Sequence, residues 1–227
     1  MESAEETGRR VGRPRLRTEA IVEAALSIID EDGADALSMR SLAQRLNSST
    51  ATIYRHFQSR AALVVAVIDR ALGEIFDDVA EVASGDWRQV IRRTATGYFA
   101  ALNRHPGVAR LLADHTPVGP NAMVLREAWL SAMLRNGLSV EMAARTGGLM
   151  ASYVQGFGIQ LAGERARSGT DDEMLKKTVG ELDPADYPSV SAVLRSGVAP
   201  TPLEEEFIFG LDLMLDGLAA VLENQRR

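Results

Sequence analysis

The sequence predicts an all-α protein, and three observations support this fold class. Apolar residues recur at intervals of three and four positions through most of the 227 residues, which is the spacing of one face of an α-helix. Strand-like alternation of apolar and polar residues is nearly absent. Hydrophobic residues make up 46% of the chain, enough to bury a full core. We expect a small N-terminal module followed by a larger domain.

Residues 1–16 lack apolar periodicity and are expected to form a flexible basic arm. The first helix is predicted from Thr18 to Asp32, with apolar residues on one face and Gly33 ending it. Ser38 is expected to cap a short helix that runs from Met39 to Leu46.

Asn47 then suits the left-handed turn that ends this short helix. A second short helix is predicted from Thr50 to Phe57, and Ser59 is expected to cap a long helix from Arg60 to about Ala83. Two short helices joined by a tight turn cannot bury a core alone. The first helix and the start of the long one must therefore clamp them.

The rest of the chain is also predicted to be helical. The expected helices are Asp86 to Arg104, Gly107 to Asp114, Asn121 to Asn136, Ser139 to Arg167 and Pro202 to Gln225. The segment from Gly180 to Pro200 contains several prolines and glycines, which predict a loop or a broken helix.

The last helix begins with Thr201-Pro202-Leu203-Glu204, which combines an N-cap, a proline in the first turn and the Glu of a capping box. Its apolar residues cover more than one face: Phe207, Ile208, Leu211, Met214, Leu215, Leu218 and Leu222. Its own domain and a helix of a second copy are expected to bury these two faces, with burial inside one monomer as the alternative.

Composition excludes several classes of site. The chain has no cysteine, which removes disulfides, thiolate metal sites and cysteine nucleophiles. Its three histidines show no clustered ligand spacing, so no metal is expected. The N-terminal residues lack the apolar stretch of a secretory signal, and the longest apolar run, Ala61 to Ile68, is too short to span a bilayer. We expect a cytoplasmic protein with no membrane contact and no cofactor.

Charge is distributed unevenly along the chain, whose net charge is -6. Residues 8–60 hold nine arginines against six acidic residues, whereas residues 61–227 hold 16 basic residues against 22 acidic ones. A basic N-terminal part joined to an acidic remainder favours a nucleic-acid contact at the N-terminal end, although ordinary variation in surface charge is the alternative.

The segment from Leu37 to Val64 has the helix lengths of a helix-turn-helix, whose second helix enters the major groove of DNA. Short hydroxyls and cationic side chains follow one face, while Ile53 and Phe57 turn inward. Arg55 suits either a guanine edge or a phosphate. A helical hairpin that only completes a core is the alternative. The expected DNA-binding residues are Arg13, Arg15, Ser38, Arg40, Thr50, Ala51, Thr52, Tyr54, Arg55, His56 and Arg60.

Arg13 and Arg15 belong to the arm, where Gly12-Arg13-Pro14 stands among further arginines. This pattern resembles an AT-hook, which inserts into an A·T-rich minor groove. A solvated tail that adds only nonspecific, salt-dependent attraction explains the same residues equally well.

The helix-turn-helix segment resembles the DNA-binding domain of the TetR family of bacterial regulators. The resemblance is carried by Leu37-Ser38-Met39-Arg40, Leu42-Ala43, Leu46, Thr52-Ile53-Tyr54-Arg55-His56-Phe57, Arg60 and Leu63. The sequence departs from the family at Asn47, where glycine is usual, and at Arg60, where lysine is common. Both changes keep the expected structure and phosphate contact, because Asn tolerates the left-handed turn and Arg binds phosphate well. The close match covers about residues 17–65, and residues 207–218 resemble the last helix of some members more weakly.

The resemblance implies a three-helix helix-turn-helix DNA-binding domain at residues 17–64, followed by a helical ligand-binding and dimerisation domain at residues 65–227. It also implies a homodimer, joined through the last two helices of each subunit, on a palindromic operator. Glycines between Gly147 and Gly163 would fit close packing, a kink or space for a small-molecule effector. Aromatic and methionine residues at helical spacing, with His115 and Gln160 to orient a polar group, form the candidate pocket, and plain core is the alternative. The candidates are Tyr98, Leu102, Leu111, His115, Trp129, Met133, Met150, Tyr153, Phe157 and Gln160.

The expected function is therefore a sequence-specific transcriptional regulator, a repressor that a small-molecule effector releases from DNA. The alternative is an architectural DNA-binding protein of low specificity, whose affinity would fall steeply with salt. An enzyme is not expected, because the sequence shows no nucleophile paired with a base, no phosphate-binding loop and no carboxylate–histidine cluster.

Overall fold

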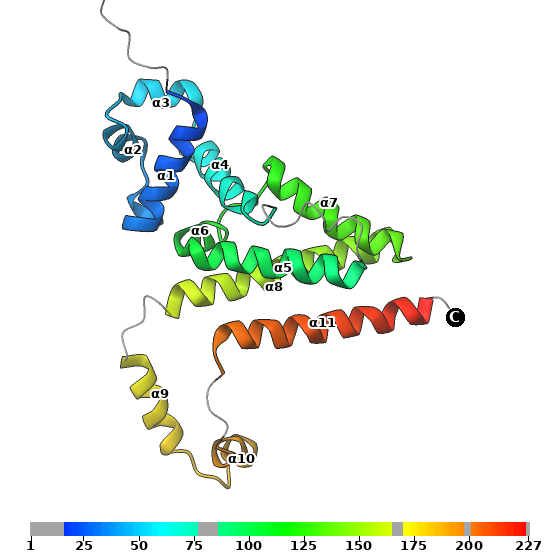
Figure 1. Cartoon of the computed structure of the whole chain (residues 1–227). Helices are drawn as coiled ribbons and strands as arrows, with labels where there is room; N and C mark the ends of the chain where they lie inside the picture. The colour runs from blue at the N-terminus through cyan, green and yellow to red at the C-terminus, as the bar shows by residue number, and fades with distance from the viewer. Residues whose placement is uncertain (1–15, 77–85, 165–169, 198–200, 226–227) are drawn as a thin grey trace, which may run out of the picture.

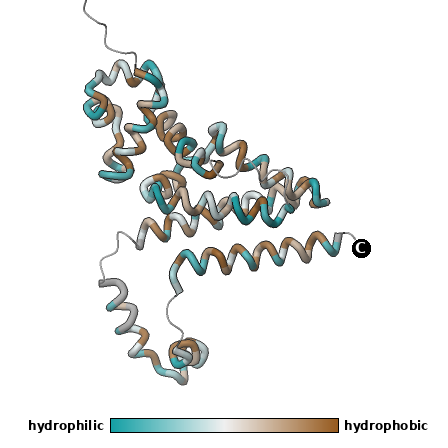
Figure 2. Tube along the Cα trace, in the orientation of Figure 1, coloured by the Kyte–Doolittle hydropathy of each residue, from teal (hydrophilic) through white to brown (hydrophobic). Residues whose placement is uncertain are grey.

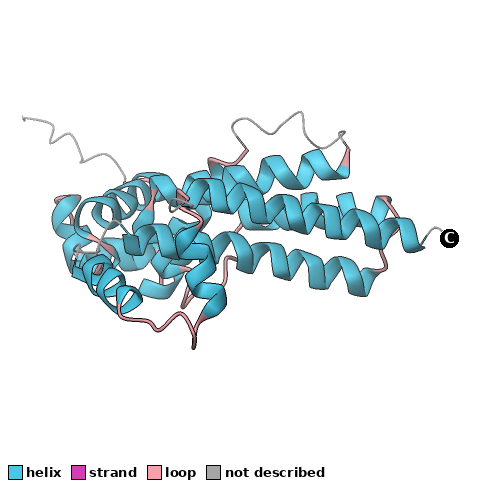
Figure 3. Cartoon of the chain, turned by 90° about the horizontal axis from the view of Figure 1, so that it is seen from below, coloured by secondary structure: helices cyan, strands magenta, loops and turns pink. Residues whose placement is uncertain are grey.

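The computed structural model describes residues 16–76, 86–164, 170–197 and 201–225. Throughout these residues the chain is helical and contains no strand, which confirms the all-α fold class (Figure 3). A small N-terminal group of helices lies at one end of α4, and a larger helical body lies at the other (Figure 1).

The N-terminal group, which we call the head, consists of α1 to α3 and the first half of α4. Its elements are α1 (Thr18–Asp32), the 3-10 turn η1 (Ala34–Ala36), α2 (Met39–Arg45), α3 (Thr50–His56) and α4 (Arg60–Gly73). The expected bounds of the first helix are confirmed, with Gly33 at φ 87° just after it. Asn47 adopts the expected left-handed conformation, with φ 49°.

Serine side chains start three successive helices of the head. The hydroxyl of Ser38 accepts a hydrogen bond from the backbone N–H of Ser41 at 3.0 Å, as expected for a cap. Ser59 caps α4 in the same way, and Ser49, which sequence analysis did not single out, caps α3. These helices therefore carry their own start signals.

The head has an apolar core that α1 and α4 close on both sides, as expected. Its fully buried side chains are Ile21, Ile29, Leu37, Leu42, Ile53 and Leu63. Burying a side chain of this size contributes about 1.5–3 kcal/mol. The two short helices are held in place by this core.

Helix α4 ends at Gly73, so the expected continuation to Ala83 is wrong over the residues that the structure describes. From Glu74 to Phe76 each backbone N–H donates to the carbonyl three residues earlier, and not four residues earlier as in an α-helix. A side chain at Gly73 would meet the amide of Asn121 at 3.0 Å, which shows how closely α7 approaches here. Expected positions 77–83 lie outside the described residues.

The body contains the remaining helices, and four of them agree with expectation to within a few residues. They are α5 (Trp87–Arg104), α7 (Pro120–Arg135), α8 (Val140–Glu164) and α11 (Leu203–Gln225). Helix α6 (Pro106–Leu111) is shorter than expected, because the chain turns at residues 112–114. Helix α9 (Thr170–Gly180) was not anticipated, and the broken-helix alternative for residues 180–200 contains α10 (Pro188–Arg195).

Helices α5, α7 and α8 pack together and α11 lies along them, whereas α9 and α10 stand off the body (Figure 1). The ring of Phe207 on α11 stacks on Phe99 of α5, with centroids 4.2 Å apart. The Tyr153 hydroxyl of α8 donates to the Phe207 carbonyl at 2.7 Å. These contacts place the two long helices α8 and α11 next to each other in the body. Hydrophobic residues recur along the whole of α11 (Figure 2).

Candidate functional site

Helix α3 presents a polar face to solvent at the tip of the head. Ile53 is fully buried and Phe57 is 8% exposed, so the inward side of the helix is apolar. The outward side carries Thr50, Ala51 and half-exposed Tyr54, followed by Arg55 and His56. A short exposed helix with this composition can enter a major groove.

Hydrogen bonds arrange the polar side chains of α3 before any ligand arrives. The hydroxyls of Ser49 and Thr52 lie 3.0 Å apart, and the Arg55 guanidinium donates to Thr52 at 3.3 Å. His56 shares a 3.0 Å hydrogen bond with the Thr18 hydroxyl at the start of α1. Arg55 therefore lies along the outer face of α3, and His56 joins α3 to α1.

The flanking residues expected to contact phosphate occupy different surroundings. Arg40 is exposed on α2, whereas the Ser38 hydroxyl is used in its helix cap. Arg60 donates through Nε to the Leu37 carbonyl at 2.8 Å and through Nη2 to the Ala34 carbonyl at 3.2 Å. Arg60 thus braces the turn before α2 while staying exposed. Arg13 and Arg15 lie outside the described residues.

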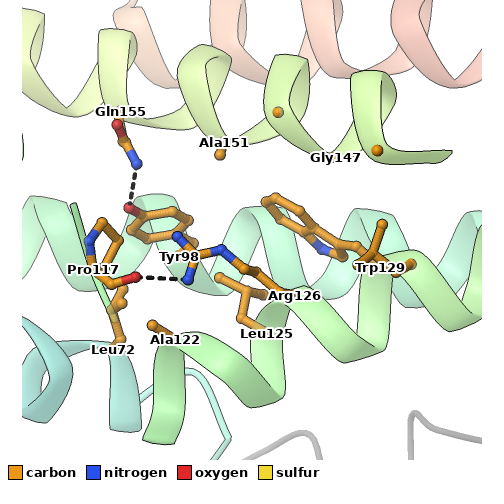
Figure 4. A pocket seen from close by; sticks show the side chains of 13 residues that line it. Leu72, Tyr98, Pro117, Ala122, Leu125, Arg126, Trp129, Gly147, Ala151 and Gln155 are labelled. Atoms are coloured by element: carbon orange, nitrogen blue, oxygen red, sulfur yellow. Dashed lines mark hydrogen bonds between the residues drawn. The ribbon is translucent and has the colours of Figure 1, made fainter. Parts of the chain in front are cut away.

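A cavity of about 320 Å³ lies in the body next to α4 (Figure 4). This volume is at the lower end of small-molecule sites, which run from about 300 to 1000 Å³. The cavity is bounded by α4, α5, α7, α8 and the loop before α7. Its lining residues are Leu72, Tyr98, Pro117, Ala122, Leu125, Arg126, Trp129, Leu130, Ala144, Gly147, Gly148, Ala151 and Gln155.

Three polar side chains interrupt the apolar wall of the cavity. Arg126 donates to the Pro117 carbonyl at 2.7 Å, and the Gln155 amide donates to the Tyr98 oxygen at 3.1 Å (Figure 4). Burial raises the pKa of Tyr98 to about 12, although the Gln155 hydrogen bond and the Arg126 charge act in the opposite direction. Tyr98 is therefore a neutral phenol at pH 7.

Of the residues expected from sequence to form the pocket, Tyr98 and Trp129 line this cavity. The indole N–H of Trp129 donates to Thr94 at 2.6 Å, which fixes the ring in the wall. The others lie elsewhere: Leu102, Leu111, Met133 and Met150 are in the core, Tyr153 and Phe157 are in the aromatic cluster with Phe207, His115 is half-buried and Gln160 is exposed.

Sequence analysis missed Arg126 and Gln155, two of the polar groups that the cavity offers a ligand. A signal for Arg126 was present, since it follows the apolar residues 122–125 of α7 directly. In the part of the chain that the structure describes, no three carboxylate or histidine residues gather as a metal site.

A buried carboxylate joins α4 to the start of α7. Asp69, 7% exposed, accepts hydrogen bonds from the Ala122 N–H at 3.0 Å and from the Asn121 amide at 3.2 Å. The Asn121 amide also donates to the Asp69 carbonyl at 3.0 Å. Gly119 lies so close that any side chain there would overlap the Asp69 carboxyl group. Asp69 thus caps a helix that lines the cavity.

An ionic cluster connects the head to the body beside α6. His105 lies 2.8 Å from the Asp30 carboxylate of α1 and 3.2 Å from the Glu74 carboxylate that follows α4. Arg104 donates to Glu74 at 2.8 Å, and Arg70 pairs with both Glu74 and Glu23. Residues of α1, α4 and α5 therefore meet in one network.

The outer faces of α8 and α11 carry exposed apolar side chains. Phe209 is 67% exposed, and Leu149 and Leu213 are each 57% exposed. Ile159 of α8 is also exposed, at 38%. Large apolar side chains left exposed on two neighbouring helices are typical of a site of protein association.

Comparison with known proteins decides the family. The family described as "Bacterial regulatory proteins, tetR family" matches residues 21–67, and "Tetracyclin repressor-like, C-terminal domain" matches residues 81–222. The chain belongs to the TetR family. The repressor DrrR1 of Streptomyces coeruleorubidus is 30% identical, with 98% of this chain and 85% of that protein covered.

Solved structures of TetR-family proteins share the fold. The apo structure of ActR from Streptomyces coelicolor is 29% identical, with a TM-score of 0.81 over 93% of this chain and 99% of ActR. ActR in complex with actinorhodin gives a TM-score of 0.80 at 29% identity, over 91% and 98% of the two chains.

These relatives confirm the expected function and family. The chain is a DNA-binding transcriptional regulator of the TetR family, and the architectural alternative is not supported. No helix in the described ranges is long and apolar enough to cross a membrane.

Proposed function

We propose that this regulator is a homodimeric repressor that leaves a palindromic operator when a small molecule occupies the cavity. The observation that carries this proposal is the position of α4. This helix begins at Arg60, separated from the end of α3 by residues 57–59 alone. Its penultimate residue, Leu72, lines the cavity. One helix therefore spans the distance between the DNA-binding surface and the ligand site.

Residues 17–64 would act as the DNA-binding domain and residues 65–227 as the ligand-binding and dimerisation domain. Thr50, Ala51, Tyr54 and Arg55 would approach base edges because they occupy the exposed face of α3. Phosphate contacts would come from the nearby polar residues Ser38, Arg40, Thr52, His56 and Arg60. The arm with Arg13 and Arg15 would add contacts that weaken with salt.

The exposed apolar faces of α8 and α11 would pair with the same faces of a second copy. One side of α11 is buried in the core, and the other side leaves the large apolar side chains of Phe209 and Leu213 exposed to solvent. A second copy related by a two-fold axis would bury them. Such a dimer presents two α3 helices to successive major grooves, which requires operator half-sites about one helical turn apart.

The effector would be a small organic molecule, as in the complex of ActR with actinorhodin. The apolar wall of the cavity and its three polar groups are typical of small-molecule sites. This function requires no metal, cofactor or catalytic chemistry. Its place would be the cytoplasm, where the bacterial chromosome lies.

Fluorescence anisotropy of the purified protein against its own upstream intergenic DNA, with a scrambled duplex as control, tests the function. We expect a preference of at least about 1000-fold at physiological salt, since specific binding exceeds nonspecific binding by this factor or more. Equal affinity for both duplexes, lost steeply with salt, would contradict the proposal.

Arg55→Ala tests the assignment of α3. If Arg55 reads a base, the substitution costs about 1–3 kcal/mol of operator binding and relaxes specificity at one position. A uniform loss on all sequences would assign it to phosphate instead. Arg195→Ala, an exposed arginine on α10, is the matched control and should leave both affinities unchanged.

A further inference from the structure

Arg126 places a cation in the wall of an apolar cavity. Its guanidinium contacts the Pro117 carbonyl at 2.7 Å and the Met123 sulfur at 3.8 Å. Within the described residues, no carboxylate forms a salt bridge with it. The side chain is half-buried and points into the cavity beside Tyr98 (Figure 4).

A partly desolvated guanidinium that is held by one neutral carbonyl leaves most of its five N–H donors available. Removing such a charge from water is costly unless an anion or several acceptors compensate it. Planar anionic groups fit a guanidinium with two parallel hydrogen bonds, which are about twice as strong as neutral ones. The cavity therefore favours a ligand that brings negative charge to Arg126.

Other lining residues define the rest of the ligand. The flat indole of Trp129 and the side chains of Leu72 and Leu125 supply apolar surface, and Gly147 and Gly148 keep the facing stretch of α8 free of side chains. The Tyr98 hydroxyl accepts from Gln155, so its own proton remains available for an acceptor on the ligand. This shape suits an aromatic ring system with oxygen substituents.

We propose that Arg126 recognises an anionic oxygen on a flat aromatic effector, and that this oxygen replaces the Pro117 carbonyl as its partner. The inference rests on the proposed function and names the ligand class of the same cavity. It makes Arg126 both the specificity-determining residue of the site and a latch on the loop before α7.

The latch is connected to α4 through only a few residues. Pro117 and Gly119 belong to one short loop, and Gly119 lies against the Asp69 carboxyl group. Asp69 in turn caps α7 through the Ala122 N–H. When Arg126 releases Pro117, the loop loses its tie to α7, while Asp69 keeps its hydrogen bonds to Asn121 and Ala122. A shift of Gly119 in the released loop would press on the Asp69 carboxyl group and so act on α4.

Two fluorescent probes with the same ring system test the recognition step. 8-Anilinonaphthalene-1-sulfonate is anionic, and N-phenyl-1-naphthylamine is its neutral counterpart. We expect the full-length dimer to prefer the anionic probe, and Arg126→Met to weaken the anionic probe by roughly tenfold or more while changing the neutral one less than about twofold. Arg126→Lys, which keeps the cation, should retain most of the preference.

Glu127→Gln is the matched control, because Glu127 is the neighbouring charged residue on α7 and faces solvent. It should bind both probes as the unchanged protein does. Equal loss of both probes in Arg126→Met, or an unchanged preference for the anion, would overturn the recognition step. Arg126→Gln provides a second neutral variant if Arg126→Met does not fold.

Operator binding without any probe tests the latch. Arg126→Met should weaken operator affinity several-fold even in the absence of effector, because the Pro117 tie is already broken. An affinity equal to that of the unchanged protein would overturn the latch. If the unchanged protein shows no operator preference, the proposed function itself fails. If that preference is present but Arg126→Met matches the unchanged protein on probes and DNA, only this inference fails.

Discussion

Three helices of the head and three of the body begin by different means, whereas α1 has no side-chain cap and α8 follows Ser139, whose hydroxyl accepts from the Met142 N–H at 3.2 Å. In the head, α2, α3 and α4 each start at a serine whose hydroxyl accepts from a backbone N–H three residues later. In the body, α5, α6 and α7 start without any hydrogen bond from their own N-cap side chain. Helix α7 receives its cap from Asp69, on another helix.

Some helix starts are therefore determined by neighbouring residues in the sequence, and that of α7 is determined by a contact with a distant residue. A serine cap depends on a few neighbouring residues, so the first turns of α2, α3 and α4 are defined within the head itself. The start of α7 depends on α4 being in place. A helix that needs a partner to define its first turn can respond when that partner moves, which suits the half of the molecule to which the proposed function assigns ligand binding.

Asp69→Ala tests the tertiary cap and should have the largest effect. The substitution leaves the buried Ala122 N–H without an acceptor, and one such orphaned donor together with a small cavity costs about 3 kcal/mol of unfolding free energy. Chemical denaturation followed by circular dichroism measures this loss. Asp114→Ala, an exposed carboxylate in the loop before α7, should stay within about 0.5 kcal/mol.

Operator affinity extends this test from stability to function. Asp69→Ala should also weaken operator binding, because α4 loses its tie to α7. A variant that is destabilised as expected yet binds DNA normally would show that the cap is structural only, and the contrast between head and body would lose its functional meaning.

Gly107→Ala tests the contact between the two regions. A side chain at Gly107 would overlap Ile29 of α1 and lie 2.9 Å from its carbonyl oxygen. Such overpacking costs about 2 kcal/mol and should shift α6 relative to the head. Gly163→Ala on α8 meets no atom within 4 Å and should be neutral or slightly stabilising. Equal melting temperatures of the two variants would refute the close contact.

The same contrast explains how much of the fold was predictable. The bounds of α1, the Ser38 cap and the turn at Asn47 followed from apolar spacing and local chemistry. The end of α4 did not, because the sequence continues with helix-compatible residues beyond Gly73. The helix ends where Asn121 of α7 approaches Gly73 and where the chain enters a run of tight turns. Neither feature can be predicted from the residues next to Gly73 in the sequence.

The cavity was less predictable than the exposed face of α3. Apolar residues that face a cavity and those that face the core have the same spacing, so Met133 and Met150 looked as suitable as Trp129. Charged residues inside apolar stretches were the better signal. Asp69 and Arg126 both interrupt apolar helix faces, and both turn out to have buried or half-buried partners.

Ser59→Ala sharpens the comparison on the head side, with a smaller effect. Loss of a serine cap costs about 1 kcal/mol, because one N–H in the first turn of α4 loses its acceptor. Ser59→Asn restores an acceptor and should recover most of this stability. A loss as large as that of Asp69→Ala would show that the head depends on its caps as strongly as the body depends on Asp69.

Substitution of Glu74 should have the smallest effect on stability, and the size of this effect should depend on pH. Burial alone would raise the pKa of Glu74, but hydrogen bonds from His105 and Arg104 outweigh it and hold the pKa below the usual 4.5. A depressed carboxyl pKa stabilises the folded state fully above 4.5, and this contribution is lost as the pH falls through the folded pKa. Glu74→Gln should therefore lower the melting temperature by about 2 °C at pH 7.

The difference between the two proteins should narrow as the pH falls below 4.5 and through the lowered pKa of Glu74, where the native carboxyl group becomes protonated as well. Glu127→Gln, an exposed control, should show a smaller difference at every pH. A gap between Glu74→Gln and the unchanged protein that widens in acid would reverse the expected sign. The ionic cluster would then owe its strength to charges other than Glu74, and the link between head and body would not be held by this carboxylate.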